Sequence, residues 1–388
     1  MISDSQQATS TGARWGDTPW RVPIELALTA SPPRCEVVVI GGGFAGLSTA
    51  YHLALRGVRV AVLEAGPLGA GASGRTGGLV LEGTAAGPLE QVDACLETIA
   101  SVVARADIAC DLTLGGCRQV RHEAAAAGRR PGWRDGDGWI VVTGTEPGGT
   151  VDPGKLVAGL AAAARRGGAE LCPGVAVHAL AARNARGYRV ICDGGVEIEA
   201  EQVVVALNAY AAQLVRLPHE LHAALTLALC TAPVDAAFLE AIGFADPAPF
   251  YTLDLPYLWG RWVPDGRLIF GAGLIFPDDG DVRGVDLGEP SAAHSMAHLE
   301  ERVRALHPAL AAIDVTHRWG GPIAFRREGA PFLGRVPGAP GVIVCAGCAG
   351  HGVALSVRVG QLITAAVVDG APFPAWGALP PTCDLRAN

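Results

Sequence analysis

The chain has 388 residues, of which 50% are hydrophobic and 18% are charged, with a formal net charge of −8. This composition excludes a largely disordered chain. The negative charge disfavours nucleic acid and anionic membranes as partners, since neither attracts an acidic protein. The length exceeds a single compact core and suits two intertwined domains.

The first 33 residues read as a leader segment. Their polar start, MISDSQQATSTGARWGD, contains no apolar stretch of the kind found in a secretory signal. We expect Trp15, Pro19 and Trp20 to dock on the body of the protein. The apolar stretch from Val342 to Val368 is interrupted by charged and polar residues, so it is not a membrane span.

Ten cysteines are scattered without the spacing of a disulfide framework. We interpret them as reduced thiols in a cytoplasmic protein. Cys345 and Cys348 form a C-x-x-C, for which a redox dithiol is a minority interpretation and a zinc site a weaker one. No metal is expected.

A strand, a turn, a helix and a second strand are predicted in the next part of the chain. Cys35 to Ile40 is a continuous apolar run typical of a buried strand. A helix follows from Phe44 to Arg56 and ends at Gly57. Val58 to Leu63 forms the second strand. The pattern predicts a unit that binds a dinucleotide.

The turn of this unit reads G-x-G-x-x-G at Gly41, Gly43 and Gly46. Gly41 permits the tight turn, Gly43 lets the backbone approach a pyrophosphate, and Gly46 lets the helix pack close to the sheet. The helix N-terminus favours the anion. Glu64, roughly 20 residues downstream, is placed to accept the ribose hydroxyls.

The middle of the chain continues as a mixture of helices and strands. After a Gly-dense loop we expect a helix from Leu89 to Leu112, and a second from Pro153 to Arg166. Between them, residues 113–150 show one clear strand, Trp139 to Thr143. Three strands follow within 170–207, and then a helix from Asn208 to Val215.

Residues 216–315 read as an antiparallel unit. Asp265-Gly266 separates two alternating runs, which predicts a hairpin with a two-residue turn. Met296 to Leu306 forms an amphipathic helix. The strand, Gly loop and helix pattern then returns near the C-terminus.

The predicted fold class is α/β, with a Rossmann-type, glutathione-reductase-like dinucleotide-binding domain and an inserted α+β substrate domain built on an antiparallel sheet. The dinucleotide-binding domain is discontinuous and the substrate domain has two pieces. The expected dinucleotide-binding domain comprises residues 34–112, 151–215 and 316–388, and the substrate domain 113–150 and 216–315.

Five sequence blocks then point to one family. The loop GASGRTGG at 71–78 comes first, and VVVALNAY, PDGRLIFGAG, RWGGPIAFRREGAPFLGRVPG and AGCAGHGVALSVRVGQLI follow in order. Together they resemble the D-amino-acid oxidase superfamily of FAD-dependent oxidoreductases, most closely its γ-glutamylputrescine oxidase-type and glycine/sarcosine oxidase-type members. The resemblance implies FAD, whereas a nicotinamide enzyme would have no use for the GASGR-x-GG loop.

The resemblance implies roles for individual residues. Ser73 and Arg75 would hold the phosphate and ribityl region, Gly77 and Gly78 would pass under the isoalloxazine, and the backbone of Val177 would meet the adenine. A helix N-terminus at 350–352 would face the flavin's pyrimidine end, where reduced flavin is anionic. The expected cofactor-binding residues are Gly41, Gly43, Phe44, Ala45, Gly46, Glu64, Ala65, Ser73, Arg75, Gly77, Gly78, Val177, Asn208, Gly350, His351, Gly352 and Val353.

On the substrate side, Tyr257, Trp259 and Arg261 alternate along one predicted strand and so share a face. This face would offer the substrate two aromatic walls and one cation; the alternative is an ordinary half-buried strand with a snorkelling Arg. His351, Tyr257 and Arg261 are the catalytic candidates. The alternative for His351 is a loop histidine that caps its helix.

Ile323 is a substrate-binding candidate where glycine oxidase-like members place an Arg that clamps a carboxylate. The nearby Arg326 and Arg327 are out of register. A simple amino acid is therefore disfavoured. Residues 319–334 lack the Cys through which sarcosine oxidase-like members attach FAD, so we expect non-covalent FAD. Residues 268–275 lack the Lys with which those members activate oxygen, so the identity of the electron acceptor stays open.

The sequence favours an FAD-dependent oxidase acting on the C–N bond of an amine or amino-acid derivative. A hydride passes to the flavin, an imine forms, and O2 reoxidises the flavin to give H2O2. The alternatives are an amine dehydrogenase using another acceptor and a non-catalytic flavin-binding protein. Residues 113–150 look shorter than the usual helical cover, which favours an open site and a bulky or carrier-tethered substrate.

Overall fold

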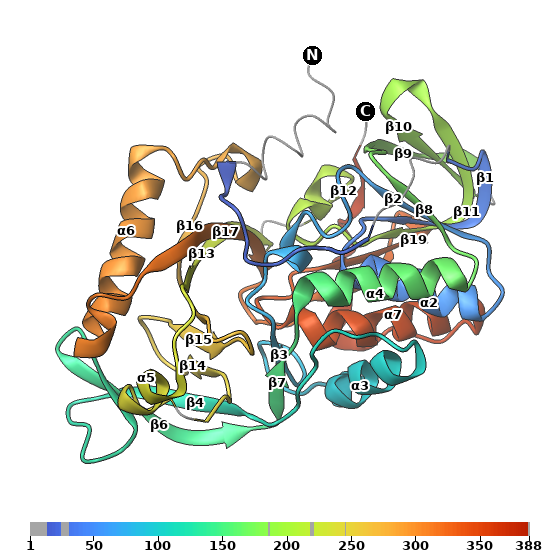
Figure 1. Cartoon of the computed structure of the whole chain (residues 1–388). Coiled ribbons are helices and arrows are strands. Elements are labelled where there is room, and N and C mark those ends of the chain that lie inside the picture. The colour runs from blue at the N-terminus through green and yellow to red at the C-terminus, as the bar shows by residue number, and fades with distance from the viewer. Residues whose placement is uncertain (1–13, 25–30, 185–186, 218–220, 245, 387–388) are drawn as a thin grey trace.

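The computed structural model describes residues 14–24, 31–184, 187–217, 221–244 and 246–386. Its strands form two eight-stranded sheets, and two further pairs of strands lie outside them (Figure 1). Helices pack against both large sheets, so the fold is a mixed α/β fold, as predicted.

The first sheet has a parallel centre. Parallel ladders join β1 to β2 and β11, β2 to β8, and β11 to β19, whereas β18 pairs antiparallel with β19. An antiparallel extension, β10 and β9, continues from β11. In spatial order the main strands are β18 (Phe332–Val336), β19 (Ala339–Ala346), β11 (Glu197–Val205), β1 (Arg34–Ile40), β2 (Val60–Glu64) and β8 (Glu170–Pro173), with β10 at Gly187–Cys192 and β9 at Val177–Asn184.

Four helices lie together beside this sheet in Figure 1. They are α2 (Phe44–Leu55), α3 (Cys95–Arg105), α4 (Pro153–Arg166) and α7 (Gly352–Val368). Their apolar side chains share one buried core with the sheet. Close packing depends on glycine: a Cβ on Gly46 would lie 1.9 Å from the carbonyl oxygen of Gly41, and one on Gly360 would lie 2.3 Å from Ser48 Oγ.

The helix predicted from Leu89 to Leu112 is shorter than expected. Gln91 adopts a left-handed conformation with φ 67°, and Asp107 does so with φ 52°, so the chain cannot remain helical at either place. The carboxylate of Glu82 accepts the N–H groups of Cys95 at 2.6 Å and Leu96 at 3.1 Å, which satisfies the first turn of α3.

The second sheet is antiparallel apart from the parallel pair β14 and β4. Helices α5 (Ala236–Ala241) and α6 (Pro290–Ala305) pack against it. In spatial order its strands are β17 (Val315–Phe325), β13 (His222–Thr231), β16 (Leu268–Ile275), β15 (Trp259–Trp262), β14 (Phe250–Thr252), β4 (Cys117–Glu123), β6 (Gly138–Glu146) and β5 (Pro131–Asp135).

Two expectations for this region need correction. Residues 113–150 do not hold a single strand: they supply β4, β5 and β6 to the second sheet, and β7 (Gly148–Thr150) pairs with β3 (Leu79–Leu81). Strand β17 crosses the boundary expected at residue 316 and pairs along its length with β13 of the second sheet.

The hairpin at Asp265-Gly266 forms with a different turn. The N–H of Val263 donates to the carbonyl of Arg267 at 2.8 Å, and that of Gly266 donates to the carbonyl of Val263 at 2.9 Å. Gly266 takes the left-handed conformation with φ 91°. The loop therefore has three residues and a glycine bulge, not two residues.

Two other helices differ from their predictions. Residues Asn208–Gln213 form a 3₁₀ helix, followed by the short strand β12 (Val215–Arg216), which pairs with β20 (Asp384–Leu385). Helix α6 begins at Pro290, six residues before the predicted Met296.

The described part of the leader docks as predicted. Trp15 and Trp20 are 2% and 7% exposed. The Trp15 indole N–H donates to the carbonyl of Val285 at 3.0 Å, and that of Trp20 donates to the carbonyl of Thr76 at 2.9 Å. The leader thus contacts the GASGR-x-GG loop and the segment that precedes α6.

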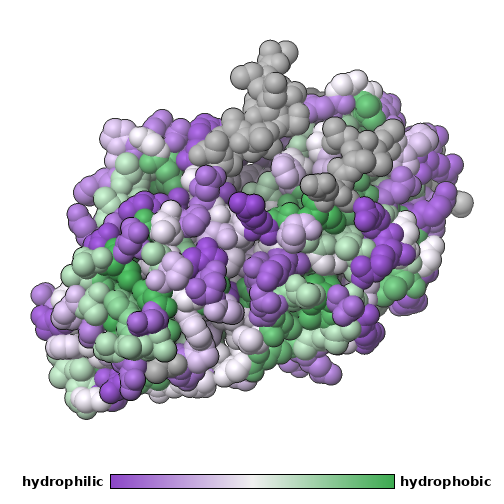
Figure 2. All heavy atoms as spheres, viewed as in Figure 1, coloured by the Kyte–Doolittle hydropathy of each residue, from purple (hydrophilic) through white to green (hydrophobic). Residues whose placement is uncertain are grey.

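Figure 2 shows hydrophilic residues over the whole visible face, with smaller hydrophobic patches between them. In the described structure, no helix is both long and apolar enough to cross a membrane.

Candidate active site between the two sheets

A cavity of about 1260 Å³ lies between the two sheets. One side is formed by the segments that follow β1, β11 and β19, at the carboxyl ends of the parallel strands. The other side is formed by residues of β13, β15, β16 and β17 and by one face of α6. This is the edge at which open α/β sheets bind their ligands.

Most of the predicted site residues lie on this cavity. Those that line it are Gly43, Phe44, Ala45, Ser73, Arg75, Gly77, Asn208, Tyr257, Trp259, Ile323, Gly350, His351, Gly352 and Val353. Those outside its lining are Gly41, Gly46, Glu64, Ala65, Gly78, Val177 and Arg261. Val177 opens β9 and its role toward adenine remains a prediction.

Two helix N-termini open into the cavity. Gly43 and Phe44 begin α2, and Gly352 begins α7. A Cβ on Gly43 would lie 2.7 Å from Ser73 Oγ, and the N–H of Phe44 donates to the same oxygen at 2.9 Å. Unpaired N–H groups and aligned peptide dipoles make such ends suitable for anionic groups.

Glu64 is half-buried at the end of β2. Its two oxygens accept N–H groups from Gly42 at 2.7 Å and Gly66 at 3.0 Å. Burial raises the pKa of this carboxyl, and the backbone donors of Gly66 and Gly42 oppose that rise. A carboxylate fixed beside the glycine turn fits the ribose contact that a dinucleotide requires.

The indole of Trp259 forms one wall of the cavity. It packs so closely between two glycines that a Cβ on Gly77 would lie 2.2 Å from its ring and a Cβ on Gly271 2.1 Å from it. Only residues without a side chain fit at both positions. This arrangement joins the GASGR-x-GG loop to the second sheet.

Arg261 does not contact the cavity, which corrects its assignment as a catalytic and substrate-binding candidate. It is 2% exposed, and its Nη1 donates to the carbonyls of Gly77 at 3.1 Å, Gly78 at 3.2 Å and Val151 at 2.7 Å. Its guanidinium lies over the Trp20 ring, 5.6 Å from the centroid. Burial lowers its pKa to about 10. Arg261 and Trp259 share a face of β15, as predicted, but the loop covers Arg261, and Tyr257 precedes the strand and is not part of it.

Arg75 is also committed to the protein. Its Nε donates to the carbonyl of Gly320 at 2.8 Å and its Nη2 to that of Gly16. The guanidinium lies 5.6 Å from the centroid of the Trp15 ring. The leader therefore helps to position the Arg75 side chain at the cavity wall.

His351 lies at the N-terminus of α7 without capping it, since its side chain makes no capping hydrogen bond. Its Nδ1 lies 3.3 Å from the carbonyl oxygen of Ala349. Burial lowers the pKa of the ring, so the neutral form is favoured. Asn208 supports the same loop: its Oδ1 accepts the N–H of Gly347 at 2.9 Å and that of Cys348 at 3.3 Å.

Ile323, a substrate-binding candidate from the sequence, lines the cavity. Neither neighbouring arginine lines the cavity: Arg326 packs 4.1 Å from the centroid of the Phe332 ring, and Arg327 is exposed. In the described structure, Arg75 and Arg302 are the only lysine or arginine side chains that line this cavity.

Arg302, on α6, was not predicted as a site residue. It forms a two-pronged ion pair with Asp135, at 2.9 and 2.6 Å, and donates to the carbonyls of Pro256 and Tyr257 at 2.8 and 2.9 Å. It thus anchors the loop that carries Tyr257. Other lining residues that the sequence analysis did not assign to the site are Leu255, Leu274, His294, His298, Cys345 and Cys348. Of these, only Cys345 and Cys348 had been singled out in the sequence, as a C-x-x-C motif.

The contacts of His122 with Asp135, which pairs with Arg302, and with Asp254 predict that the stability of the protein depends on pH. His122 Nε2 lies 2.7 Å from Asp135 and Nδ1 lies 2.8 Å from Asp254. Burial lowers the pKa of His122, but its hydrogen bonds to both carboxylates outweigh burial and leave it raised above 6.5. Protonated His122 therefore stabilises the folded protein fully below pH 6.5, and this contribution is lost as the pH rises through the raised pKa of His122.

We expect the free energy of unfolding, measured in urea, to fall in the wild type as the pH rises from 6.5 through the raised pKa of His122. It should fall less in His122→Gln. Equal slopes in the two proteins would contradict this role. His317, whose pKa burial lowers, provides a control position as His317→Gln.

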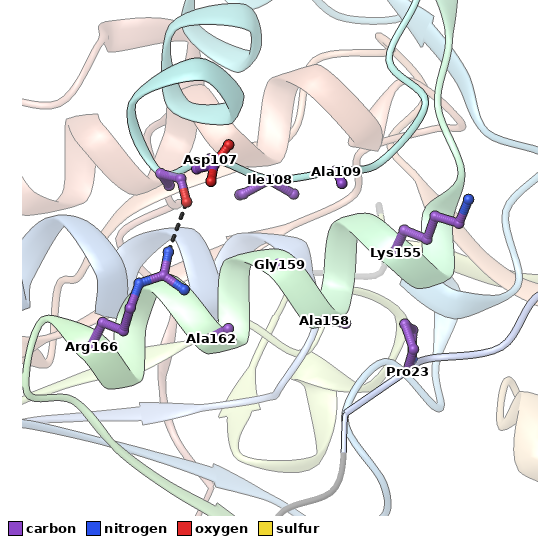
Figure 3. A pocket seen from close by; sticks show the side chains of 10 residues that line it. Pro23, Asp107, Ile108, Ala109, Lys155, Ala158, Gly159, Ala162 and Arg166 are labelled. Carbon is purple, nitrogen blue, oxygen red and sulfur yellow. Dashed lines mark hydrogen bonds between the residues drawn. The ribbon is translucent and has the colours of Figure 1, made fainter.

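A second, smaller hollow of about 240 Å³ lies between α4 and the segment that follows α3 (Figure 3). Arg166 spans it and donates to the carbonyl of Ala106 at 2.7 Å, and Lys155 pairs with Asp111 at 2.6 Å. Both of its cations, Lys155 and Arg166, are therefore paired with other groups of the protein.

Comparison with known proteins agrees with the geometry. The family model described as FAD dependent oxidoreductase (DAO) matches residues 36–366. The chain belongs to this family. The family description makes this chain an FAD-dependent oxidoreductase.

The chain is similar over most of its length to several DAO-family proteins. It is 27% identical over 372 residues to a probable oxidoreductase OrdL of Rhizobium meliloti, covering 85% of this chain and 82% of that protein. It is 26% identical over 391 residues to the gamma-glutamylputrescine oxidoreductase of Escherichia coli, covering 89% and 87%. Glycine oxidase of Geobacillus kaustophilus is 27% identical over 368 residues, covering 85% and 92%.

Solved structures share the fold. Glycine oxidase from Geobacillus kaustophilus superposes with a TM-score of 0.69 at 20% identity, covering 89% of this chain and 96% of that one. L-proline dehydrogenase from P. horikoshii superposes with a TM-score of 0.70 at 19% identity, covering 88% and 95%.

Proposed function

We propose that the protein oxidises the C–N bond of an amine whose carboxylate is absent or distant from the reacting nitrogen, using non-covalent FAD. The observation that carries this proposal is the cavity itself. It joins two helix N-termini and the GASGR-x-GG loop to a wall of apolar and aromatic side chains. When bound, FAD supplies the acceptor for a hydride from the carbon beside the nitrogen.

The protein's part is positioning. The two helix N-termini would hold the anionic parts of FAD, and Glu64 its ribose. Trp259 and Tyr257 would orient the amine, and an apolar wall favours its uncharged, reactive form. Loss of hydride leaves an imine, which water hydrolyses to a carbonyl compound and a smaller amine or ammonia.

The absence of a carboxylate clamp follows from how the lining cations are used. Arg302 is paired with Asp135 and holds two carbonyls, and Arg75 holds two backbone carbonyls. Ile323 contributes only apolar surface. An α-carboxylate at this place would lose its hydration without gaining a partner, which is costly.

We propose O2 as the electron acceptor, with H2O2 as its product. Another acceptor would make the enzyme a dehydrogenase. The yield of peroxide per amine oxidised in air, compared with turnover by an artificial dye under nitrogen, separates the two. Turnover that requires the dye would overturn the oxidase assignment.

Anaerobic bleaching of the flavin tests the reaction class. We expect the absorbance of bound FAD near roughly 450 nm to disappear on addition of N-alkyl and primary amines, and to persist with glycine and D-alanine. A yellow protein that no amine bleaches would support a non-catalytic flavin-binding role. Bleaching by simple α-amino acids with similar efficiency would contradict the missing clamp.

An apolar rim surrounds the cavity mouth and favours a bulky substrate. Leu255 is 84% exposed, and Tyr257 and Leu274 are each 44% exposed, yet all three line the cavity. In the described structure, no residue of 113–150 lines it. The rim offers apolar contact to the part of a substrate that projects from the cavity, including a tail or carrier.

Removal of the most exposed rim residue should reduce efficiency toward long amines. In Leu255→Ser we expect kcat/KM for a six- to eight-carbon alkylamine to fall roughly fivefold to tenfold, since burial of a leucine side chain contributes about 1.5–3 kcal/mol when complete. Methylamine oxidation should change less than twofold. Leu55→Ser, at a 58% exposed position on α2, is the matched control. An equal loss for short and long amines would exclude a rim contact.

A further inference from the structure

Two thiols share the cavity with the flavin-binding segments. All ten cysteines are buried, and within the described residues Cys345 and Cys348 are the two that line the cavity. They form the C-x-x-C that the proposed amine oxidation does not use. Cys345 lies near the end of β19, and Cys348 lies in the loop that leads to α7.

The loop that carries Cys348 is fixed by its backbone. Its N–H donates to Asn208 Oδ1 at 3.3 Å, and its carbonyl accepts the N–H of His351 at 2.9 Å. Its sulfur lies 4.0 Å from the position that a Cβ on Gly352 would occupy, at the first residue of α7. The thiol is therefore held close to a helix N-terminus, where a thiolate is stabilised.

The two thiols interact and are not equivalent. The interaction with Cys345 lowers the pKa of the Cys348 thiol and raises the pKa of the Cys345 thiol. Ser356 also lowers the pKa of Cys348. Burial instead raises the pKa of cysteines elsewhere, such as Cys35 to about 12. One member of the pair is suited to attack and the other to resolve.

We propose that Cys345 and Cys348 form a reversible dithiol–disulfide couple that exchanges two electrons with FAD held in the same cavity. The inference depends on the FAD site but not on amine oxidation. In the oxidising direction the two thiols form one S–S bond and give two electrons and two protons to the flavin. The reverse transfer restores both thiols.

The external reductant of the disulfide is a small dithiol or thiol. The cavity opens to solvent through its apolar rim, and Cys348 is 9% exposed against 2% for Cys345. Attack on the Cys348 sulfur forms a mixed disulfide, and a second thiol releases it with two electrons and two protons transferred in total.

Thiol titration in redox buffers tests the couple without any amine. The FAD-free and FAD-loaded proteins are equilibrated anaerobically with oxidised and reduced dithiothreitol, alkylated, and analysed by mass spectrometry. We expect Cys345 and Cys348 to lose alkylation together, with a mass consistent with one disulfide, while the other eight thiols stay reduced. Alkylation of both at every potential in both forms of the protein would overturn the inference.

Communication with the flavin needs its own readout. In FAD-loaded wild type with a reduced pair, we expect a long-wavelength charge-transfer absorbance that Cys348→Ser lacks and that Cys35→Ala retains. A dithiol-reduced sample should also reduce the flavin faster in wild type than in Cys345→Ser. A disulfide that forms without altering either signal would overturn the exchange with FAD.

The thiol titration uses the wild-type protein alone, so it tests the couple even if a serine variant fails to fold. Failure of the proposed function has a different signature: FAD binds and the couple titrates, but no amine bleaches the flavin. If amines bleach the flavin while Cys345 and Cys348 stay reduced at every potential, the dithiol–disulfide couple is excluded and the proposed amine oxidation is not affected.

Discussion

Gly46→Val is expected to abolish FAD binding. The added Cβ would lie 1.9 Å from the carbonyl oxygen of Gly41 and 3.2 Å from Val39. Because the nearest atom is backbone, α2 must move away from the sheet, and its N-terminus moves with it. We expect FAD affinity to weaken at least about 100-fold, equivalent to about 2.7 kcal/mol, and the fold to lose about 1–3 kcal/mol from overpacking.

Flavin fluorescence titration measures the affinity, and urea unfolding measures the stability. Gly115→Val is the matched control, because Gly115 is exposed and a Cβ there meets nothing within 4 Å. Binding of FAD by Gly46→Val within threefold of wild type would show that close approach of the helix does not determine the site.

Arg261→Met, behind the cavity wall, is expected to give a large loss of stability. The change removes a buried cation that holds the carbonyls of Gly77, Gly78 and Val151. Three buried acceptors lose their donor, and each such loss costs about 1–3 kcal/mol. We expect the free energy of unfolding to fall by about 3–5 kcal/mol, which is typical when one partner of a buried charged interaction is removed. FAD should also bind more weakly, because the loop of Gly77 and Gly78 is no longer held in place.

Thermal and urea unfolding without FAD separate the loss of stability from the loss of cofactor. Arg59→Met is the control, since the Arg59 side chain is 68% exposed, and should change stability by less than about 1 kcal/mol. If Arg261→Met folds as stably as wild type but loses amine oxidation, Arg261 acts on substrate after all, and our reassignment is wrong.

The first βαβ unit could be predicted because every signal in it is local. Gly41 and Gly57 both adopt the left-handed backbone that stops a strand and a helix. Helix α4 was equally clear: Asp152 caps it by accepting the N–H of Lys155 at 2.9 Å, and Pro153 occupies its first position.

The strands of 113–150 could not be predicted because their stability comes from distant partners. Strand β4 reads CRQVRHE, with few apolar residues. It pairs with β14, more than 100 residues later, and with β6. Neither pairing leaves a periodic pattern in the sequence.

Arg261 shows the corresponding limit within the site. The period of two correctly put Arg261 on the face of Trp259. It carried no information about which segment covers that face, and here Gly77 and Gly78 do so. The anchoring role of Arg302 was hidden for the same reason, since Asp135 is distant in sequence.

The docking of Trp15 has a consequence for the order in which the newly made protein becomes functional. This residue leaves the ribosome early, but its partners are Val285 and, through the N–H donated to its carbonyl, Gly320. The glycine turn at the start of the chain likewise shares its cavity with residues as late as Ser356. The lining of the flavin site is therefore complete only after the chain has been made as far as Ser356, and FAD cannot meet the finished cavity before then.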